Sequence, residues 1–188
     1  MSELSEYGQV VDFERPWLGG YFPDGDPLSY YPELWTWLRD TCGVRSVLDV
    51  GCGAGKAVHF FKSLGCEAYG VDGLPPYDPL IHQHDFTLGP YDPGRDFDLV
   101  WCCEFVEHVA HEFMENYLAT FQRGRLLLMT HAVPGQGGHH HVNCQPDDYW
   151  IAAMEERGFR FDIGLTTTAR AFTPGGYFSW SGLAFVRG

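Results

Sequence analysis

The sequence lacks several features that mark whole classes of protein. No apolar run approaches the roughly 18 residues of a membrane span, so we expect no transmembrane helix. The first 16 residues, MSELSEYGQVVDFERP, lack the basic start and apolar centre of a signal peptide. The six cysteines form no CxxC pair, which argues against both a cysteine-ligated zinc site and a disulfide framework. We therefore predict reduced thiols in a cytoplasmic protein.

Basic residues are also scarce. Lysine and arginine together number 12 against 25 aspartates and glutamates, which gives a formal net charge of −13. Binding to nucleic acid draws on lysine and arginine, so a nucleic-acid partner is not expected. The chain has no internal repeat or low-complexity tract, and 45% of its 188 residues are hydrophobic. This length and composition predict one globular domain over residues 1–188.

Strand and helix patterns alternate along most of the chain. Apolar runs predict strands at 46–50, 67–72, 96–102 and 124–132, with a further short strand near 81–84. Helical patterns predict helices at 29–43, 55–65, 104–121 and 145–158. The last two expected strands, 159–165 and 177–188, follow each other without a clear helix. This order predicts an α/β fold with a mainly parallel sheet and an antiparallel edge strand.

A glycine-rich turn is the strongest short signal. In VLDVGCGAGKAVHFF a buried strand leads through Gly51, Gly53 and Gly55 into a helix. The GxGxxG dinucleotide fingerprint is excluded because position 56 is Lys56, and the spacing does not fit a phosphate-binding P-loop. What remains is D-x-G-x-G-x-G beginning at Asp49, with an acidic residue, Asp72, at the end of the next strand.

This pattern resembles the class I S-adenosylmethionine-dependent methyltransferases, which have a Rossmann-like fold. The resemblance implies that Asp49 and the three glycines hold the methionine part of S-adenosyl-L-methionine, and that Asp72 accepts from the ribose hydroxyls. In HDF, Asp85 would accept from the exocyclic amine of the adenine and Phe86 would lie near the ring. The implied cofactor-binding set is Asp49, Gly51, Cys52, Gly53, Gly55, Asp72, Gly73, Asp85, Phe86 and Cys103.

The stretch CCEFVEHV raises a second question. On a helix, Glu104, Glu107 and His108 are separated by three and four residues, so they would share one face. Two carboxylates and an imidazole form a mixed donor set that suits Mg²⁺ or Mn²⁺. E-x-x-E-H resembles two metal-using branches of the fold, the ubiquinone-pathway O-methyltransferases and the small-RNA 3′-terminal 2′-O-methyltransferases. The second branch implies a fourth ligand from GGHHH, for which His140 is the closest match, with His139 and His141 beside it.

Other interpretations of these residues remain open. Glu107 and His108 occur together in metal-free members of the fold, and the histidine cluster could be an ordinary loop. A histidine, His108 or His140, could instead be the general base, with Glu107 in the catalytic set, because imidazole titrates near neutral pH. The aromatic N-terminal segment within 1–43 is either simple packing of the first helix or a lid over the acceptor site.

We expect a methyltransferase that O-methylates a hydroxyl of a small molecule, a sugar or a phenolic compound, with a divalent metal. The alternatives are a metal-free N- or O-methyltransferase, an RNA 2′-O-methyltransferase, and an inactive cofactor-binding partner subunit. The histidine cluster and the E-x-x-E-H stretch argue against the inactive subunit, since it would need neither.

Overall fold

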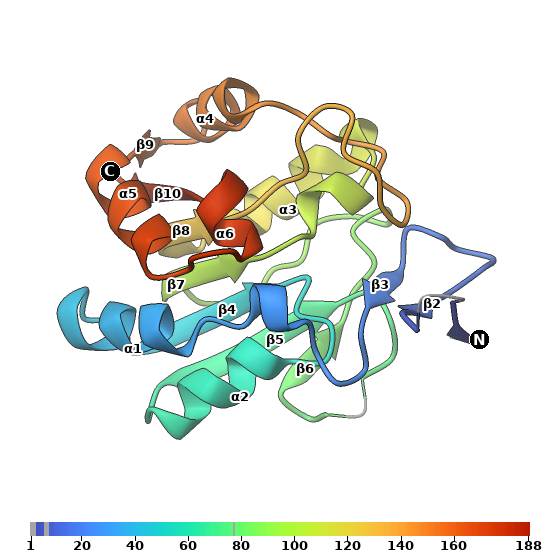
Figure 1. Cartoon of the computed structure of the whole chain (residues 1–188), viewed down its shortest axis with the longest axis horizontal. Helices are drawn as coiled ribbons and strands as arrows, with labels where there is room; N and C mark the ends of the chain where they lie inside the picture. Colours follow the sequence, from blue (N-terminus) through green and yellow to red (C-terminus); the bar gives the residue numbers. More distant parts are fainter. Residues whose placement is uncertain (1–2, 6–7, 77) are drawn as a thin grey trace.

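The computed structural model describes residues 3–5, 8–76 and 78–188, and a seven-stranded sheet forms its centre (Figure 1). The strand order is β6-β5-β4-β7-β8-β10-β9. The parallel strands are β4 (Ser46–Val50), β5 (Glu67–Asp72), β6 (Ile81–Gln83), β7 (Phe97–Cys102) and β8 (Gly124–Met129). β10 (Leu183–Arg187) pairs antiparallel with both β8 and β9 (Phe159–Phe161). The predicted α/β fold with an antiparallel edge is confirmed.

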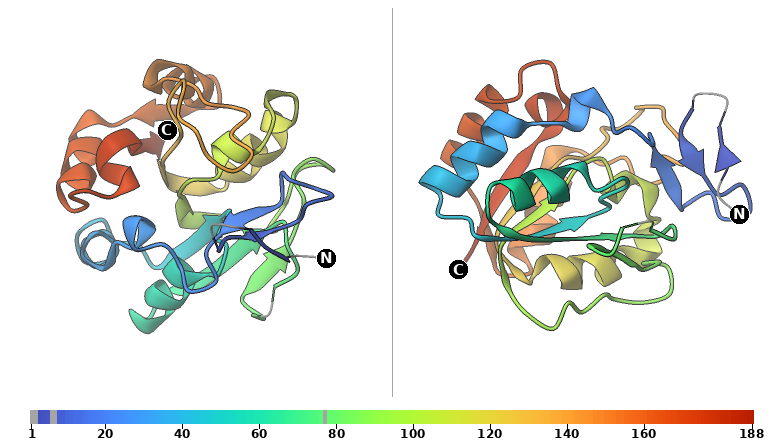
Figure 2. Two further views of the ribbon diagram at one scale, coloured as in Figure 1. Left: turned by 45° about the vertical axis from the view of Figure 1, so that its right-hand side comes forward. Right: turned by 90° about the horizontal axis from the view of Figure 1, so that it is seen from below.

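Two hydrophobic cores lie on opposite faces of this sheet, because successive side chains of a strand alternate between faces. Val47 joins the first core and Leu48 the second. The first core contains residues of α1 (Pro32–Thr41), α2 (Lys56–Ser63), α5 (Ile163–Ala171) and α6 (Tyr177–Ser181). The second contains residues of α3 (Met114–Phe121) and α4 (Asp147–Glu155), and Figure 2 shows the resulting layers. None of the helices in the described part of the chain has both the length and the hydropathy of a membrane span.

The N-terminal segment is more ordered than its irregular sequence suggests. β1 (Glu3–Leu4), β2 (Val10–Val11) and β3 (Gly19–Tyr21) form a small antiparallel sheet, followed by a 3₁₀ turn, η1 (Pro27–Ser29). A Cβ on Gly19 would lie 3.1 Å from Leu74 Cδ1, and one on Gly53 would lie 2.8 Å from Tyr21 Cβ. The small sheet therefore packs against the loops that follow β4 and β5, at the edge where open α/β sheets bind ligands.

The predicted helix over 104–121 is wrong in its first half. Residues Val106–His108 and His111–Phe113 form two separate 3₁₀ turns, η2 and η3, and the α-helix begins only at Met114. The backbone carbonyl of Glu107 accepts from Val142 N at 2.9 Å and Asn143 N at 3.1 Å instead of from an amide one helical turn ahead. Pairing with a distant loop has replaced the hydrogen bonding that a continuous helix requires.

The C-terminal prediction is also corrected. The expected strand 159–165 ends at Phe161, because the Asp162 carboxylate accepts from Leu165 N at 2.9 Å and caps α5. The expected strand 177–188 begins with a helical turn, α6, and only Leu183–Arg187 form β10. Two helices therefore separate β9 from β10.

Candidate functional site

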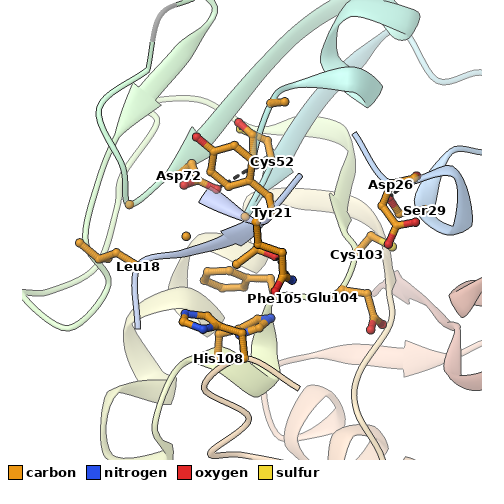
Figure 3. Close-up of a pocket in the computed structure, with 18 of the residues that line it drawn as sticks. Leu18, Tyr21, Asp26, Ser29, Cys52, Asp72, Cys103, Glu104, Phe105 and His108 are labelled. Carbon is orange, nitrogen blue, oxygen red and sulfur yellow. Dashed lines mark hydrogen bonds between the residues drawn. The ribbon is translucent and has the colours of Figure 1, made fainter. Parts of the chain in front are cut away.

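A cavity of about 340 Å³ opens at the carboxyl ends of the parallel strands. Its wall is formed by residues of the N-terminal sheet, the glycine loop, the segment after β7 and the histidine loop, which is residues 136–142. Figure 3 shows Cys52 and Asp72 on one side, Asp26, Cys103 and Glu104 on another, and Tyr21 between them. The segments that meet here are distant in sequence. They lie together because several of them follow neighbouring strands of the same sheet.

The glycine loop forms one wall because its backbone turns where other residues rarely can. Gly51, Gly53 and Gly55 have φ angles of 73°, 50° and 71°, in the left-handed region. A Cβ on Gly51 would lie 2.4 Å from the Phe105 ring, so this position also has no room for a side chain. Gly53 N donates to Asp72 Oδ2 at 2.8 Å, which joins the loop to the end of β5.

Two carboxyl groups flank this loop, that of the buried Asp49 and that of the half-buried Asp72. Burial raises the pKa of Asp49 well above its usual value, and the nearby Asp72 raises it further. Burial also raises the pKa of Asp72, although backbone N–H groups of Gly53, Leu74 and Gly73 partly offset the effect. Asp72 Oδ2 accepts from Gly53 N at 2.8 Å, and Oδ1 accepts from Leu74 N at 3.2 Å. A carboxylate has about four acceptor positions, so Asp72 keeps acceptor capacity for a ligand beyond its backbone N–H donors.

Asp85 and Phe86 lie in the same cavity wall. Asp85 Oδ1 accepts from Thr87 N at 2.9 Å and from Thr87 Oγ1 at 2.7 Å. Its Oδ2 accepts from the indole Nε1 of Trp17 at 3.1 Å. The Phe86 ring is 4% exposed and meets Phe105 edge to face, with ring centroids 5.5 Å apart.

Most of the predicted cofactor-binding set lines the cavity. The exception is Gly55, which is at the N-cap of α2 and shapes the turn without lining the wall. The residues that do line it are Asp49, Gly51, Cys52, Gly53, Asp72, Gly73, Asp85, Phe86 and Cys103. The sequence pattern thus placed these side chains at one edge, although their contacts with a cofactor remain a prediction.

Glu104 lies at the start of the segment after β7, in an unusual backbone conformation. Its φ angle is 52°, in the left-handed region that side-chain-bearing residues seldom adopt. Burial raises the pKa of Glu104, and the Thr130 hydroxyl partly opposes that rise. Because Glu104 is not helical, the predicted shared helix face of Glu104, Glu107 and His108 does not exist. The η2 turn brings Glu107 and His108 together, and Glu104 contacts Glu107 through its carboxyl group.

A compact donor group forms next to Glu104. One ligand atom each from Glu107, His108 and His141 lie within 4.8 Å of one another. Glu107 is fully buried, and its carboxyl group shares a hydrogen bond with the neighbouring Glu104 carboxyl. Burial raises the pKa of Glu107 well above its usual value and lowers the pKa of His108 to about 3. Two neighbouring carboxyl groups buried beside two imidazoles are a costly arrangement that a bound cation would relieve.

The structure selects different histidines from the one predicted. His139 and His141 line the cavity, whereas His140 is not in its wall and has a φ angle of 47°. The ring of His108 lies 5.1 Å from that of His141 and 6.4 Å from that of His139, measured between centroids. His141 therefore replaces His140 in the donor group.

Sequence reasoning missed several other cavity residues. Tyr177 was only part of an expected strand, and Asp26 was unremarkable in a loop. In the structure Tyr177 is hydrogen-bonded to Asp26. Burial raises the pKa of Tyr177, and the charge of the Asp26 carboxylate raises it further. Trp17 and Tyr21 belong to the aromatic N-terminal segment, and both line the cavity. No local pattern would have linked them to the glycine loop.

Comparison with known proteins now identifies the family. A model of the methyltransferase domain matches residues 26–162, which is most of the chain. The chain belongs to this methyltransferase family. A ubiquinone biosynthesis O-methyltransferase of Bradyrhizobium sp. (strain ORS 278) is 31% identical over 106 residues, covering 50% of this chain and 42% of the relative. The chain spans about half the length of the curated relatives it matches.

Solved methyltransferases share the fold at low sequence identity. A sugar N-methyltransferase from Streptoalloteichus sp ATCC 53650 superposes with a TM-score of 0.62 at 16% identity, covering 86% of this chain and 88% of that one. An amino pentose methyltransferase from Micromonospora echinaspora, solved with S-adenosylmethionine bound, gives a TM-score of 0.60 at 14% identity, with 82% and 88% covered. These structures confirm the expected methyltransferase fold.

Proposed function

We propose that this methyltransferase moves the methyl group of S-adenosylmethionine to a small acceptor bound in the described cavity. The observation that carries the proposal is the Asp72 carboxylate, which lines the cavity and is held by Gly53 N at 2.8 Å and Leu74 N at 3.2 Å. Two acceptor oxygens at the cavity wall match the two neighbouring hydroxyls of a ribose. The family membership and the two aromatic walls at Phe86 and Phe105 support the same ligand.

The chain's own residues would orient the reactants. Bound S-adenosylmethionine supplies an electrophilic methyl group on a positively charged sulfur. Asp49 and the glycine loop would hold the amino-acid end, and Asp72 the ribose. Methyl transfer needs the acceptor in line with the sulfur–methyl bond, so the wall formed by Tyr21, Tyr177 and Glu104 would fix the acceptor and exclude water.

The donor group of Glu107, His108 and His141 fits a divalent metal. One ligand atom from each member lies within 4.8 Å of the others, and Glu107 is fully buried. Imidazoles suit transition metals better than Mg²⁺, so Mn²⁺ is the better candidate of the two. Such an ion would lower the pKa of an acceptor hydroxyl. The Glu104 carboxylate, next to Glu107, would add negative charge near the ion.

Charge in the cavity favours a small neutral or cationic acceptor. Lys56 is the single lysine or arginine among the described lining residues, whereas Asp26, Asp49, Asp72, Asp85 and Glu104 all contribute carboxylates. These carboxylates would repel the phosphates of a nucleic acid. We therefore propose a hydroxyl of a sugar or a phenolic compound as the acceptor.

A metal-free reaction is the second candidate. His139 Nε2 is buried at the cavity and has no hydrogen-bond partner among the described residues. An imidazole in that state can take a proton from an acceptor hydroxyl or amine. The two candidates differ in one measurable respect, since only the first loses activity when a chelator removes divalent ions.

Calorimetry with S-adenosylhomocysteine tests the cofactor part of the proposal. We expect micromolar binding to the wild-type chain and a loss of at least tenfold in Asp72→Ala, because two hydrogen bonds to the ribose disappear. Asp24→Ala, an exposed aspartate outside the cavity wall, is the matched control. A wild-type chain that does not bind S-adenosylhomocysteine contradicts the proposal.

The metal part is tested by titrating Mn²⁺ into protein saturated with S-adenosylhomocysteine. His141→Asn should abolish binding, whereas the neighbouring His140→Asn should bind like wild type. Equal binding in all three proteins would reject the donor group and favour the metal-free candidate. Methyl transfer from S-adenosylmethionine to a panel of sugars and phenols, with and without chelator, then separates the two reactions.

A further inference from the structure

A segment outside the matched family domain forms part of the cofactor cavity. The N-terminal strap, residues 17–25, crosses the ends of β4 and β5, and the family match begins only at residue 26. Leu18 is 4% exposed, and its Cδ2 would lie 2.4 Å from a Cβ placed on Gly73. The strap also contacts Gly53 through Tyr21, so it packs against both loops that would hold the cofactor.

The strap makes its most directed contact through Trp17. The indole Nε1 donates to Asp85 Oδ2 at 3.1 Å, across 68 residues of sequence. Thr87 donates twice to the other oxygen, from N at 2.9 Å and from Oγ1 at 2.7 Å. A carboxylate offers about four acceptor positions, so three are filled and one remains, on Oδ2. These three hydrogen bonds stop the carboxylate from rotating. Its remaining acceptor position is on Oδ2, the oxygen that also accepts from Trp17.

We propose that Trp17 is a positioning residue for adenine recognition: it orients Asp85 so that the remaining Oδ2 position receives the exocyclic amine of the adenine. The assignment rests on the proposed use of S-adenosylmethionine. A preset acceptor loses less conformational freedom on binding than a rotating one, and this raises affinity for a ligand that carries the amine. The same bond holds the strap against the cavity wall.

Binding of two ligands separates this role from simple packing. S-adenosylhomocysteine carries the exocyclic amine, and S-inosylhomocysteine has an oxo group in its place. We expect Trp17→Phe to weaken S-adenosylhomocysteine binding by roughly five- to tenfold while changing S-inosylhomocysteine binding by less than about twofold. Thr87→Val, which removes another donor to the same carboxylate, should show the same selectivity with a smaller loss. Trp180→Phe alters a 60% exposed tryptophan outside the cavity wall and is the matched control.

Three other outcomes would overturn the assignment, each in a recognisable way. An equal loss for both ligands means that Trp17 only packs the strap. Tighter binding of S-adenosylhomocysteine by Trp17→Phe means that the indole competes with the adenine for Asp85. A wild-type chain that binds neither ligand removes the proposed cofactor, and the assignment falls with it. Circular dichroism of each variant confirms that the comparison is between folded proteins.

Discussion

Thr130 holds Glu104 through two hydrogen bonds made by one hydroxyl group. Glu104 N donates to Thr130 Oγ1 at 2.7 Å, and Thr130 Oγ1 donates to Glu104 Oε1 at 2.8 Å. The threonine is fully buried at the end of β8, and the glutamate follows β7, so neighbouring strands carry the two partners. The pair stabilises the left-handed φ of 52° at Glu104. A strained backbone conformation is thereby held in place by a contact between residues that are distant in sequence.

Replacing this hydroxyl should loosen the turn. Thr130→Val keeps the side-chain shape but leaves Glu104 N without its acceptor, and we expect a loss of about 1–3 kcal/mol in the free energy of unfolding. Urea denaturation measures this loss. Thr167→Val removes an exposed hydroxyl that bonds only within its own helix and should change stability by less than about 0.5 kcal/mol. Similar losses in the free energy of unfolding for both variants would show that the Thr130–Glu104 contact adds no more stability than an exposed hydroxyl does.

The glycine loop allows conformational strain and steric clash to be measured separately. Gly51→Ala places a Cβ 2.4 Å from Phe105 at a φ of 73°, whereas Gly65→Ala meets no atom within 4 Å at a φ of 81°. The second variant should cost about 1–2 kcal/mol from backbone conformation alone. Gly51→Ala should cost clearly more in thermal unfolding and should lose S-adenosylhomocysteine binding. Equal destabilisation of the two would mean that Phe105 moves aside freely.

Asp98 fixes the start of β4 from the neighbouring strand. Its Oδ2 accepts from Arg45 N at 2.8 Å, Ser46 N at 3.0 Å and Ser46 Oγ at 3.1 Å. We expect Asp98→Ala to lower the free energy of unfolding by about 2 kcal/mol in urea melts. Asp96→Ala removes only exposed ion pairs and should cost less than about 1 kcal/mol. A reversed order would contradict the assignment of Asp98 as a backbone anchor.

His131 should make stability depend on pH. The ring is fully buried, and burial lowers its pKa even though Asp147, itself bound by Arg170, lies 3.1 Å from Nε2 and acts in the opposite direction. The unfolded chain therefore binds a proton at a higher pH than the folded chain. Stability is complete above about pH 6.5 and falls as the pH drops below it, by at most about 1.4 kcal/mol per pH unit.

The matched comparison for that prediction is His131→Gln, which cannot titrate. Urea melts between pH 7.5 and pH 5.5 should give a smaller loss of stability for the variant than for wild type. The other histidines are common to both proteins, so the difference in slope reports His131. Parallel slopes would mean that the His131 ring is protonated equally in the folded and unfolded chains.

The sequence predicted the parts of the molecule that depend on local pattern. The strand ending at Val50, the glycine loop and the acidic residue Asp72 follow one another within 23 residues, and each is recognisable from its neighbours. Side-chain alternation and glycine conformation act over short distances, so the parallel sheet was correctly predicted, and the glycine loop and Asp72 lie together in one cavity wall.

The rest depended on partners that are distant in sequence. Helical spacing at 104–108 predicted a shared face, but Glu104 N bonds Thr130 and the carbonyl of Glu107 bonds Val142 and Asn143. Three consecutive histidines offer no local reason to choose among them, and the choice of His141 over His140 comes from how the loop meets η2. The Trp17 contact spans 68 residues and has no sequence signature.

The double hydrogen bond from Val142 and Asn143 to the Glu107 carbonyl also bears on how this protein can vary. It fastens the histidine loop at its carboxyl end, one residue after His141. Insertions or deletions near Gly135 would then change the outline of the cavity while leaving His141 in register with Glu107. The length of this loop can therefore change without moving the donor group of Glu107, His108 and His141.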